Sequence, residues 1–224
     1  MFKRLKKIIP FSYYPYKAFM HKHKCIFVHI PKNAGSSVLT LFYDQGGRKH
    51  AKWYEFYESN DYFFRRYHKF AIVREPLARL YSAYRYCLKG GNQQSDDLAL
   101  REIILANSNG FSDFIEFVLD ADFLMLQLLF QPQYLYLYDR QLICKIDTVL
   151  RYETLHKDWQ ALAASQGYPM ELPKVNAAAV ESPVPKISPR ALAKVYSLYR
   201  LDYQLLAYPQ KSECSCDSLE QPGA

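Results

Sequence analysis

No stretch of this sequence approaches the run of about 20 apolar residues that a membrane-spanning helix needs. The basic N-terminal segment has the charge of a targeting signal, but Pro10, Ser12 and Pro15 interrupt its apolar part. A signal peptide requires a continuous apolar core, so these breaks argue against one. We therefore expect residues 1–24 to form a basic and aromatic extension outside the main domain. Peripheral contact of this extension with an anionic membrane surface stays an alternative.

Cysteine pairs with metal-binding spacing are also lacking. The chain has five cysteines, an odd number, and contains no Cys-x-x-Cys pair that would suggest zinc. Cys25, Cys87 and Cys144 lie in apolar segments, which predicts buried free thiols in a reducing compartment. Cys214 and Cys216 lie in a polar tail, residues 209–224, which we expect to be disordered.

Motifs of two large protein classes are missing as well. The phosphate loop of magnesium-dependent kinases ends in Gly-Lys-Ser or Gly-Lys-Thr, and the sequence contains neither tripeptide. It also shows no helix-turn-helix, zinc-finger or RNA-recognition pattern, although basic residues among many aromatics would suit nucleic acid. The net charge of +7 therefore favours another polyanion, such as a nucleotide, an acidic glycan or an anionic lipid.

One stretch, from Cys25 to Leu41, organises the rest of the chain. Residues 25–30 are apolar or β-branched apart from His29, which is typical of a buried parallel strand. A short polar loop, residues 31–37, follows, and apolar residues at helical spacing resume at Val38. This order directs backbone N–H groups and the positive end of a helix dipole to one point, where a phosphate or sulfate group fits. An ordinary strand-to-helix turn stays the alternative.

The side chains of this loop suit an anion. Lys32 supplies a full charge, and the hydroxyls of Ser36 and Ser37 can cap the helix or donate to the anion. Lys32 precedes Gly35 by three residues, whereas a Walker A lysine follows the last glycine of its loop. The loop therefore predicts an anion site without the magnesium-binding arrangement.

A second anion site is predicted after the next strand. Residues 70–73 form a short apolar strand that ends at Arg74, and Pro76 begins a helix to about Leu88. Ser82 lies about two turns into this helix, and Arg79 lies one turn before it. An arginine fork and a hydroxyl can clamp a phosphate, so Arg74 and Ser82 are candidates. Arg79 could contact the same phosphate, but a surface salt bridge is at least an equal alternative for it.

A third strand, residues 146–152, completes the α/β pattern. Short strands separated by helices predict a three-layer α/β fold with a central, mainly parallel sheet flanked by helices. Ligands of such sheets bind at the carboxyl ends of the strands, so Lys32 and Arg74 would open into one crevice if their strands are neighbours. Four other helices are expected, over residues 97–106, 113–119, 154–165 and 189–206. Ser112 would cap the second of these helices, and Gly167 would end the third.

Two of these segments together resemble a known family. HIPKNAGSS, residues 29–37, and VREPLARLYSAY, residues 73–84, look like the two nucleotide motifs of sulfotransferases that use 3′-phosphoadenosine 5′-phosphosulfate (PAPS). The resemblance is strongest to the carbohydrate-type branch, with the heparan 2-O-sulfotransferases and bacterial family-2 enzymes. Three later segments agree with it: DTVLRYE, residues 147–153, LPKVN, residues 172–176, and YRLDY, residues 199–203, with Tyr208. The resemblance thus covers a sulfotransferase domain over residues 25–208 and implies a P-loop-like fold.

The resemblance implies a role for each matching residue. Lys32 would contact the phosphosulfate and stabilise negative charge on the bridging oxygen as it leaves. Arg74 and Ser82 would hold the 3′-phosphate of PAPS and of its product, adenosine 3′,5′-bisphosphate. Sulfuryl transfer needs positioning and charge stabilisation, and no metal is expected. The residues that would cradle the 5′-phosphosulfate are Asn33, Ala34, Gly35, Ser36 and Ser37.

The acceptor hydroxyl needs a general base. His50 resembles the histidine that 2-O-type enzymes place between the two nucleotide motifs, and an exposed loop histidine is the alternative. Glu55 and Glu153 are other candidate bases, and Glu153 could instead order Arg151. His29 reads as a hydrogen-bonded core residue, and His68 as structural or exposed.

The sequence thus predicts sulfuryl transfer to a carbohydrate hydroxyl, on a cell-surface polysaccharide or glycolipid precursor. We expect a cytoplasmic bacterial enzyme, with the inner face of the membrane as an alternative location. A small-molecule kinase and a non-catalytic nucleotide- or polyanion-binding protein are the competing classes. The residues expected to flank an anionic acceptor or stack on its sugars are Lys49, Lys52, Arg65, Arg66, Trp53, Tyr54 and Tyr57.

Overall fold

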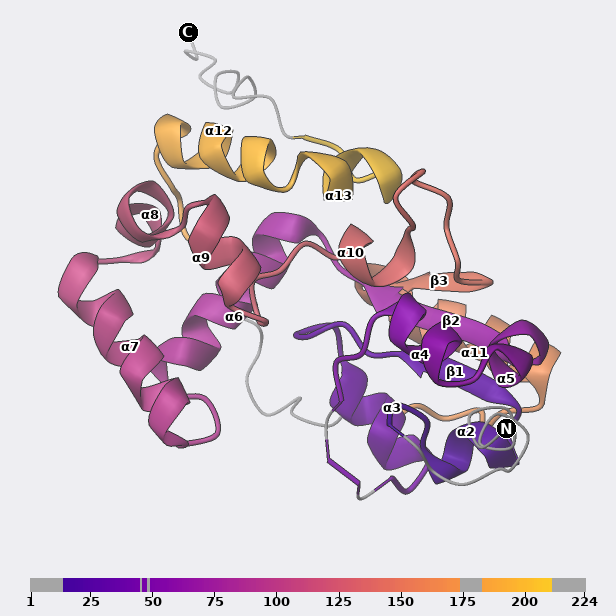
Figure 1. Cartoon of the computed structure of the whole chain (residues 1–224). Coiled ribbons are helices and arrows are strands. Elements are labelled where there is room, and N and C mark those ends of the chain that lie inside the picture. The colour runs from indigo at the N-terminus through magenta and orange to yellow at the C-terminus, as the bar shows by residue number, and fades with distance from the viewer. Residues whose placement is uncertain (1–13, 45, 48, 174–182, 211–224) are drawn as a thin grey trace, which may run out of the picture.

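The structure, a computed structural model, describes residues 14–44, 46–47, 49–173 and 183–210. Its centre is a parallel sheet of three strands in the order β1-β2-β3. The strands are β1, Cys25–Val28, β2, His68–Val73, and β3, Thr148–Arg151. The predicted α/β fold, with a parallel sheet flanked by helices, is therefore confirmed (Figure 1).

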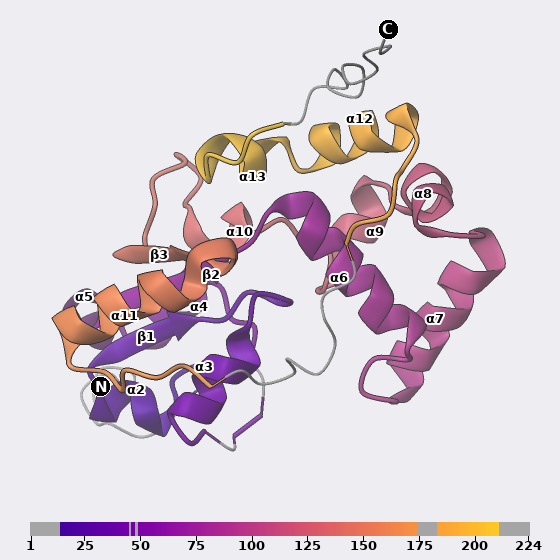
Figure 2. The ribbon, with the colours of Figure 1, turned by 180° about the vertical axis from the view of Figure 1, so that it is seen from behind.

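Helices cover both faces of the sheet. α4, Trp53–Ser59, and α5, Asp61–Arg66, lie over the face seen in Figure 1. α11, Leu155–Gln166, lies over the opposite face, seen in Figure 2. β1 is buried along its whole length, which explains why its sequence is continuously apolar rather than alternating.

The strands differ from their expected bounds. β1 ends at Val28, where pairing with Ala71 of β2 stops, and the chain then turns into the loop. β2 begins two residues early, because His68 and Lys69 still pair with β1.

Local signals located two helices correctly. α6, Pro76–Leu88, has the predicted bounds, with Pro76 in its first turn and the Glu75 side chain accepting from the N–H groups of the second and third helical residues. α11 ends at Gly167, which adopts the left-handed conformation that favours glycine. α7, Ser95–Asn107, extends the predicted helix by a few residues.

Two other predicted helices are present but differ in detail. Ser112 does not cap a helix, because its Oγ accepts from the Ser188 N–H at 3.0 Å. The chain there forms a short helix, α8, Phe111–Asp113, that continues as a π-helix, η1, Phe114–Val118.

The last helix is divided in two at the buried Tyr199, whose hydroxyl donates to the Phe130 carbonyl at 2.7 Å. The two parts are α12, Pro189–Leu198, and α13, Arg200–Leu205. The remaining elements are α2, Ala18–Lys22, α3, Gly35–Leu41, α9, Ala121–Leu126, α10, Tyr134–Leu137, and η2, Tyr152–Thr154.

Residues 14–24 pack against the domain rather than extending from it. Tyr16, Phe19 and Met20 are buried, and the Tyr16 hydroxyl donates to the carbonyls of Phe56 and Asn60. β1 begins directly after residues 14–24, so the packing of this segment against the domain supports the start of β1. Residues 1–13 and 211–224, with Cys214 and Cys216, lie outside the described residues.

The thiols of the described core match the sequence prediction in part. Cys25 and Cys87 are free and buried, and burial raises the pKa of each thiol to about 12. Cys144 is only half-buried. In the parts of the chain that the structure describes, no helix is long and apolar enough to cross a membrane.

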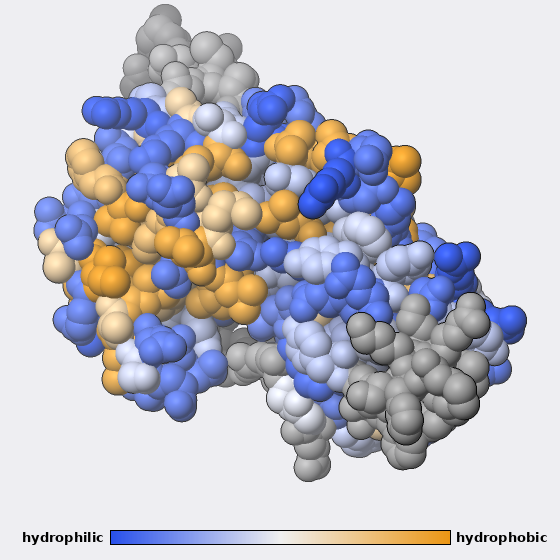
Figure 3. Space-filling model, in the orientation of Figure 1, coloured by the Kyte–Doolittle hydropathy of each residue, from blue (hydrophilic) through white to orange (hydrophobic). Residues whose placement is uncertain are grey.

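The surface divides into two unlike regions. Apolar residues gather over α7 and α9, on the left of Figure 3, while polar residues dominate the half that covers the sheet. The larger exposed apolar side chains of this region are Leu98, Ile103, Leu105, Phe117, Met125, Leu126 and Leu128.

Candidate active site

The loops that follow β1 and β2 leave the sheet at the same edge. β1 and β2 are adjacent and parallel, with Val28 opposite Ala71, and Val73 lies opposite Arg151 of β3. Lys32 therefore follows the carboxyl end of one strand and Arg74 follows that of its neighbour. Parallel sheets bind ligands at this edge, so the structure brings the two predicted cations to one side of the sheet.

The first loop is tightly folded. Lys32 and Ala34 both have a positive φ, of 68° and 58°, which turns the chain sharply before α3 begins at Gly35. Ala34 is the N-cap of α3 and no side chain caps this helix, so Ser36 and Ser37 do not fill the capping role. The first turn therefore offers backbone N–H groups near Lys32, except that of Ser37, which donates to the Ala34 carbonyl at 3.0 Å.

Gly35 lies directly against the ring of His29. A Cβ atom on Gly35 would lie 1.8 Å from His29 Nε2, where ordinary contacts begin at 3.4 Å. Only glycine allows this close approach. The prediction that His29 belongs to the core is confirmed by its burial, and its ring forms the support on which α3 begins.

Lys32 reaches across to α6. Its Nζ lies 4.1 Å from the centroid of the Tyr86 ring, a cation–π contact. Ser82 lies one turn before Tyr86 on the same helix, so these two residues share a face. Lys32, predicted to contact the phosphosulfate, therefore reaches the face of α6 that also carries Ser82, predicted to contact the 3′-phosphate.

Arg74 is buried and lies against an aromatic ring. Its side chain is buried, and its guanidinium lies 4.4 Å from the centroid of the Tyr152 ring. The next residue, Glu75, caps α6 and accepts from the Tyr203 hydroxyl at 2.8 Å. Arg74 is therefore a fixed cation beside the aromatic ring that follows β3.

His50 lies beside His29 at the same edge of the sheet. The two ring centroids are 4.3 Å apart, and His50 Nδ1 lies 3.0 Å from the backbone carbonyl oxygen of His29. A carbonyl oxygen only accepts, so Nδ1 of His50 is the donor. In the neutral ring this leaves the lone pair on Nε2, which is the tautomer that a general base needs.

The alternative bases have structural hydrogen bonds. Glu55 Oε2 accepts from the Lys52 N–H at 2.7 Å, and its Oε1 accepts from the Tyr14 hydroxyl at 2.9 Å. Glu153 accepts from the Glu75 N–H and from the Tyr208 hydroxyl. The suggestion that Glu153 orders Arg151 is not what the structure shows.

Two arginines have roles that the sequence did not predict. Arg151 donates to the carbonyls of Leu206 and Ala207. Arg79 is fully buried and donates to three carbonyls, those of Leu129, Phe130 and Gln131, so it is neither a surface salt bridge nor exposed to a ligand. Its charge holds the connection between α9 and α10.

His68 lies at the opposite edge of the sheet. It is the first residue of β2, and its Nε2 lies 3.0 Å from Thr148 Oγ1 at the start of β3. Burial lowers its pKa. The expected structural role is therefore confirmed.

The basic and aromatic segment divides between the two edges of the sheet. Lys52 lies 5.7 Å from the Tyr136 ring centroid, next to the α4 start that follows His50. Arg65 and Arg66 end α5 just before β2 begins, so they lie at the amino edge, away from Lys32. The expectation that these two arginines flank the acceptor was wrong, because the short α5 carries the chain back across the sheet. Trp53 is also engaged, since its Nε1 donates to the Tyr138 carbonyl.

Sequence reasoning missed a buried amide at the centre of the site, that of Gln133. Its Oε1 accepts from Asn33 Nδ2 at 2.8 Å and from the Arg74 N–H at 3.0 Å. In the sequence, Gln131-Pro132-Gln133 interrupts an apolar, tyrosine-rich segment. A glutamine in such surroundings is the signal that could have found it, because a buried amide needs partners.

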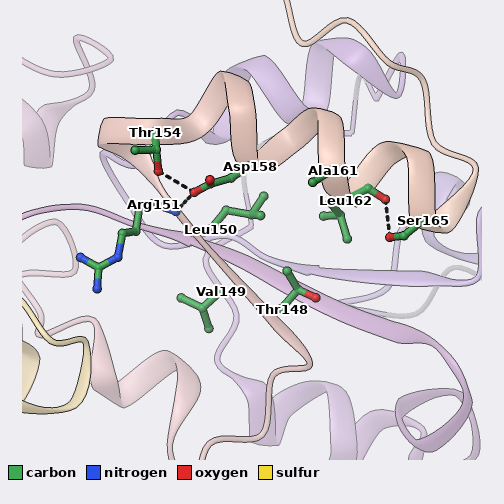
Figure 4. Close-up of a pocket in the computed structure, with 9 residues that line it drawn as sticks. All are labelled: Thr148, Val149, Leu150, Arg151, Thr154, Asp158, Ala161, Leu162 and Ser165. Atoms are coloured by element: carbon green, nitrogen blue, oxygen red, sulfur yellow. Dashed lines mark hydrogen bonds between the residues drawn. The ribbon is translucent and has the colours of Figure 1, made fainter.

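A separate, open pocket of about 570 Å³ lies between β3 and α11 (Figure 4). Its lining includes Thr148 and Leu162, and the Arg151 side chain points away from it. None of the nine residues drawn there is one predicted to hold the nucleotide. The pocket is therefore distinct from the edge that carries Lys32 and Arg74.

A parallel α/β sheet with a cationic loop after each of two neighbouring strands is typical of proteins that bind an anionic ligand at the carboxyl edge. Comparison with known families identifies the class more closely. The chain belongs to the Sulfotransferase family, whose family model matches residues 18–209. This confirms the resemblance to the heparan 2-O and bacterial family-2 type and supports sulfuryl transfer as the general activity. Comparisons with curated proteins and with solved structures found no match.

Proposed function

We propose that this protein transfers the sulfuryl group of PAPS to a hydroxyl group of a carbohydrate. The observation that carries the proposal is the placement of Lys32 and Arg74 at one edge of the sheet, after neighbouring strands. PAPS has an anionic group at each end of its ribose, the 5′-phosphosulfate and the 3′-phosphate. Two separate cations in fixed positions suit such a ligand better than they suit a ligand with one anionic end.

Each loop has groups of the right chemistry for its end of the donor. Lys32, the N–H groups from Asn33 to Ser36 and the Ser37 hydroxyl would bind the phosphosulfate, and the lysine would offset charge on the oxygen that leaves sulfur. Arg74 would bind the 3′-phosphate, with Ser82 as a hydroxyl donor. These assignments follow the matching positions of the family motifs.

His50 would act as the general base. Its Nε2 would accept the proton of the acceptor hydroxyl while that oxygen forms its bond to sulfur and the bond from sulfur to the bridging oxygen breaks. The hydrogen bond from Nδ1 to the His29 carbonyl supports this role, because it fixes the tautomer and the ring orientation. The hydrogen bonds that Glu55 and Glu153 make within the fold weigh against them as alternatives.

The carbohydrate acceptor is proposed from the family branch. Lys49 and Lys52 lie in the same connection as His50, between α3 and α4. Their positive charges would favour an acidic or partly sulfated glycan. A cell-surface polysaccharide or a glycolipid precursor would supply such hydroxyl groups.

Calorimetric titration tests the donor. We expect adenosine 3′,5′-bisphosphate to bind more tightly than 5′-AMP or ATP with a chelator present. Equal affinities, or a requirement for magnesium, would contradict the proposal and favour a kinase. Transfer of ³⁵S from labelled PAPS to a panel of acidic and neutral polysaccharides then tests the acceptor, and label on none of them would contradict the carbohydrate assignment.

A further inference from the structure

The Gln133 side chain joins the two anion-binding loops. Its amide contacts Arg74 twice, because Oε1 accepts from the Arg74 N–H at 3.0 Å and Nε2 donates to the Arg74 carbonyl at 2.8 Å. The same Oε1 accepts from Asn33 Nδ2 at 2.8 Å. One amide group thus contacts the loop after β1 and the chain after β2.

The first loop is attached to β2 by a second hydrogen bond. Asn33 Nδ2 also donates to the Ile72 carbonyl, at 2.8 Å. Asn33 and Gln133 are both buried, at 1% and 0% exposure, so these bonds are shielded from water. Buried amides that lose their partners destabilise the structure strongly, which makes this arrangement rigid.

Gln133 is itself held by the C-terminal helix. Asp202 of α13 accepts from the backbone N–H groups of Gln133 and Tyr134, each at 2.8 Å, and lies 3.5 Å from Gln133 Nε2. Asp202 is fully buried, and burial raises its pKa. The carboxylate therefore fixes both the start of α10 and the orientation of the amide.

We propose that Gln133 is a positioning residue that sets the spacing between the 5′-phosphosulfate loop and Arg74. This inference rests on the proposed function, because it assumes one ligand with an anionic group at each loop. A ligand that spans two sites gains affinity when their spacing is fixed in advance. Gln133 touches neither end of that ligand and acts through Asn33 and Arg74.

The test uses Gln133→Met, which keeps the side-chain length and removes all of its amide hydrogen bonds. Calorimetry would compare adenosine 3′,5′-bisphosphate, which spans both loops, with 5′-AMP and 3′-AMP, which each engage one. We expect affinity for the bisphosphate to fall at least about tenfold, and affinity for either monophosphate to change less than about threefold. Gln131→Met is the matched control, because the Gln131 side chain donates to the Met125 carbonyl and contacts neither loop.

The outcomes separate the two proposals. If the wild-type protein does not prefer the bisphosphate to 5′-AMP, the proposed function fails. If the wild type has the preference and Gln133→Met keeps it, the positioning role is refuted. Equal losses for all three ligands would refute it as well, since they would indicate general damage to the fold. Should Gln133→Met fail to fold, the same ratios are measured in Gln133→Asn, which keeps the uncharged amide but is one methylene too short to contact Asn33 and Arg74 together.

Discussion

Replacing Gly35 with alanine should damage the first anion loop through His29. The new Cβ would lie 1.8 Å from His29 Nε2 and 2.1 Å from its Cδ2, about 1.6 Å short of ordinary contact. The His29 ring cannot move aside easily, because it is buried between Phe27, stacked at 5.3 Å, and His50, at 4.3 Å. Either α3 or the His29 ring must therefore shift.

Overpacking of a buried site costs roughly 1–3 kcal/mol, so we expect Gly35→Ala to lower Tm by roughly 3–10 °C. Because His29 also positions His50, turnover should fall further than nucleotide affinity alone would explain. Thermal unfolding and titration with adenosine 3′,5′-bisphosphate measure the two effects. Gly110→Ala is the control, since a Cβ there would meet nothing within 4 Å.

A double-mutant cycle identifies the cause. In a His29→Ala background the space for the new Cβ is open, so Gly35→Ala should cost less there by at least about 1 kcal/mol. Strict additivity of the two changes, or a Gly35→Ala protein as stable as the Gly110→Ala control, would refute the steric argument.

The remaining predictions concern charge and protonation. Lys32→Ala should lower turnover at least about 100-fold in a PAPS-dependent assay, and near-normal turnover would exclude Lys32 from the mechanism. Arg74→Ala should weaken binding of the bisphosphate at least about tenfold more than binding of 5′-AMP, and equal losses would argue against a 3′-phosphate contact. His50→Ala should lower turnover while nucleotide affinity stays unchanged, so unaltered turnover would assign the base elsewhere. Burial lowers the pKa of His21 and His68 in the folded protein, so the unfolded chain binds more protons below their ordinary value of 6.5. Stability to urea should therefore fall as the pH drops below 6.5, and less steeply in His68→Gln; a stability that rises with acid would contradict these directions.

Local chemistry explains what the sequence predicted well. The bounds of α6 follow from Pro76 in the first turn and the helical apolar spacing behind it, and the end of α11 follows from Gly167. The positions of the loops after β1 and β2 were also predictable, because each loop depends on a few consecutive residues after a short apolar strand. These features need no knowledge of distant partners.

The parts that were missed depend on contacts between distant segments. Arg79 has the spacing of a surface residue, yet it is buried because three carbonyls before α10 surround its guanidinium. Ser112 resembles a helix cap, but its hydroxyl oxygen accepts a hydrogen bond from the backbone N–H of Ser188, 76 residues further along the chain. Gln133 connects segments about 60 and 100 residues away, and no local pattern encodes such a link. Its apolar sequence neighbours could indicate a buried amide, but they do not identify its partners.

The attachment of Asp202 to Gln133 has a consequence for the order of synthesis. Both anion loops leave the ribosome early, but the carboxylate that orients their shared amide belongs to α13, near the end of the described chain. A nascent chain that stops before α13 would carry Lys32 and Arg74 without this lock. The complete site would thus form only once α13 has been synthesised, and chains truncated before α13 would bind the proposed donor poorly.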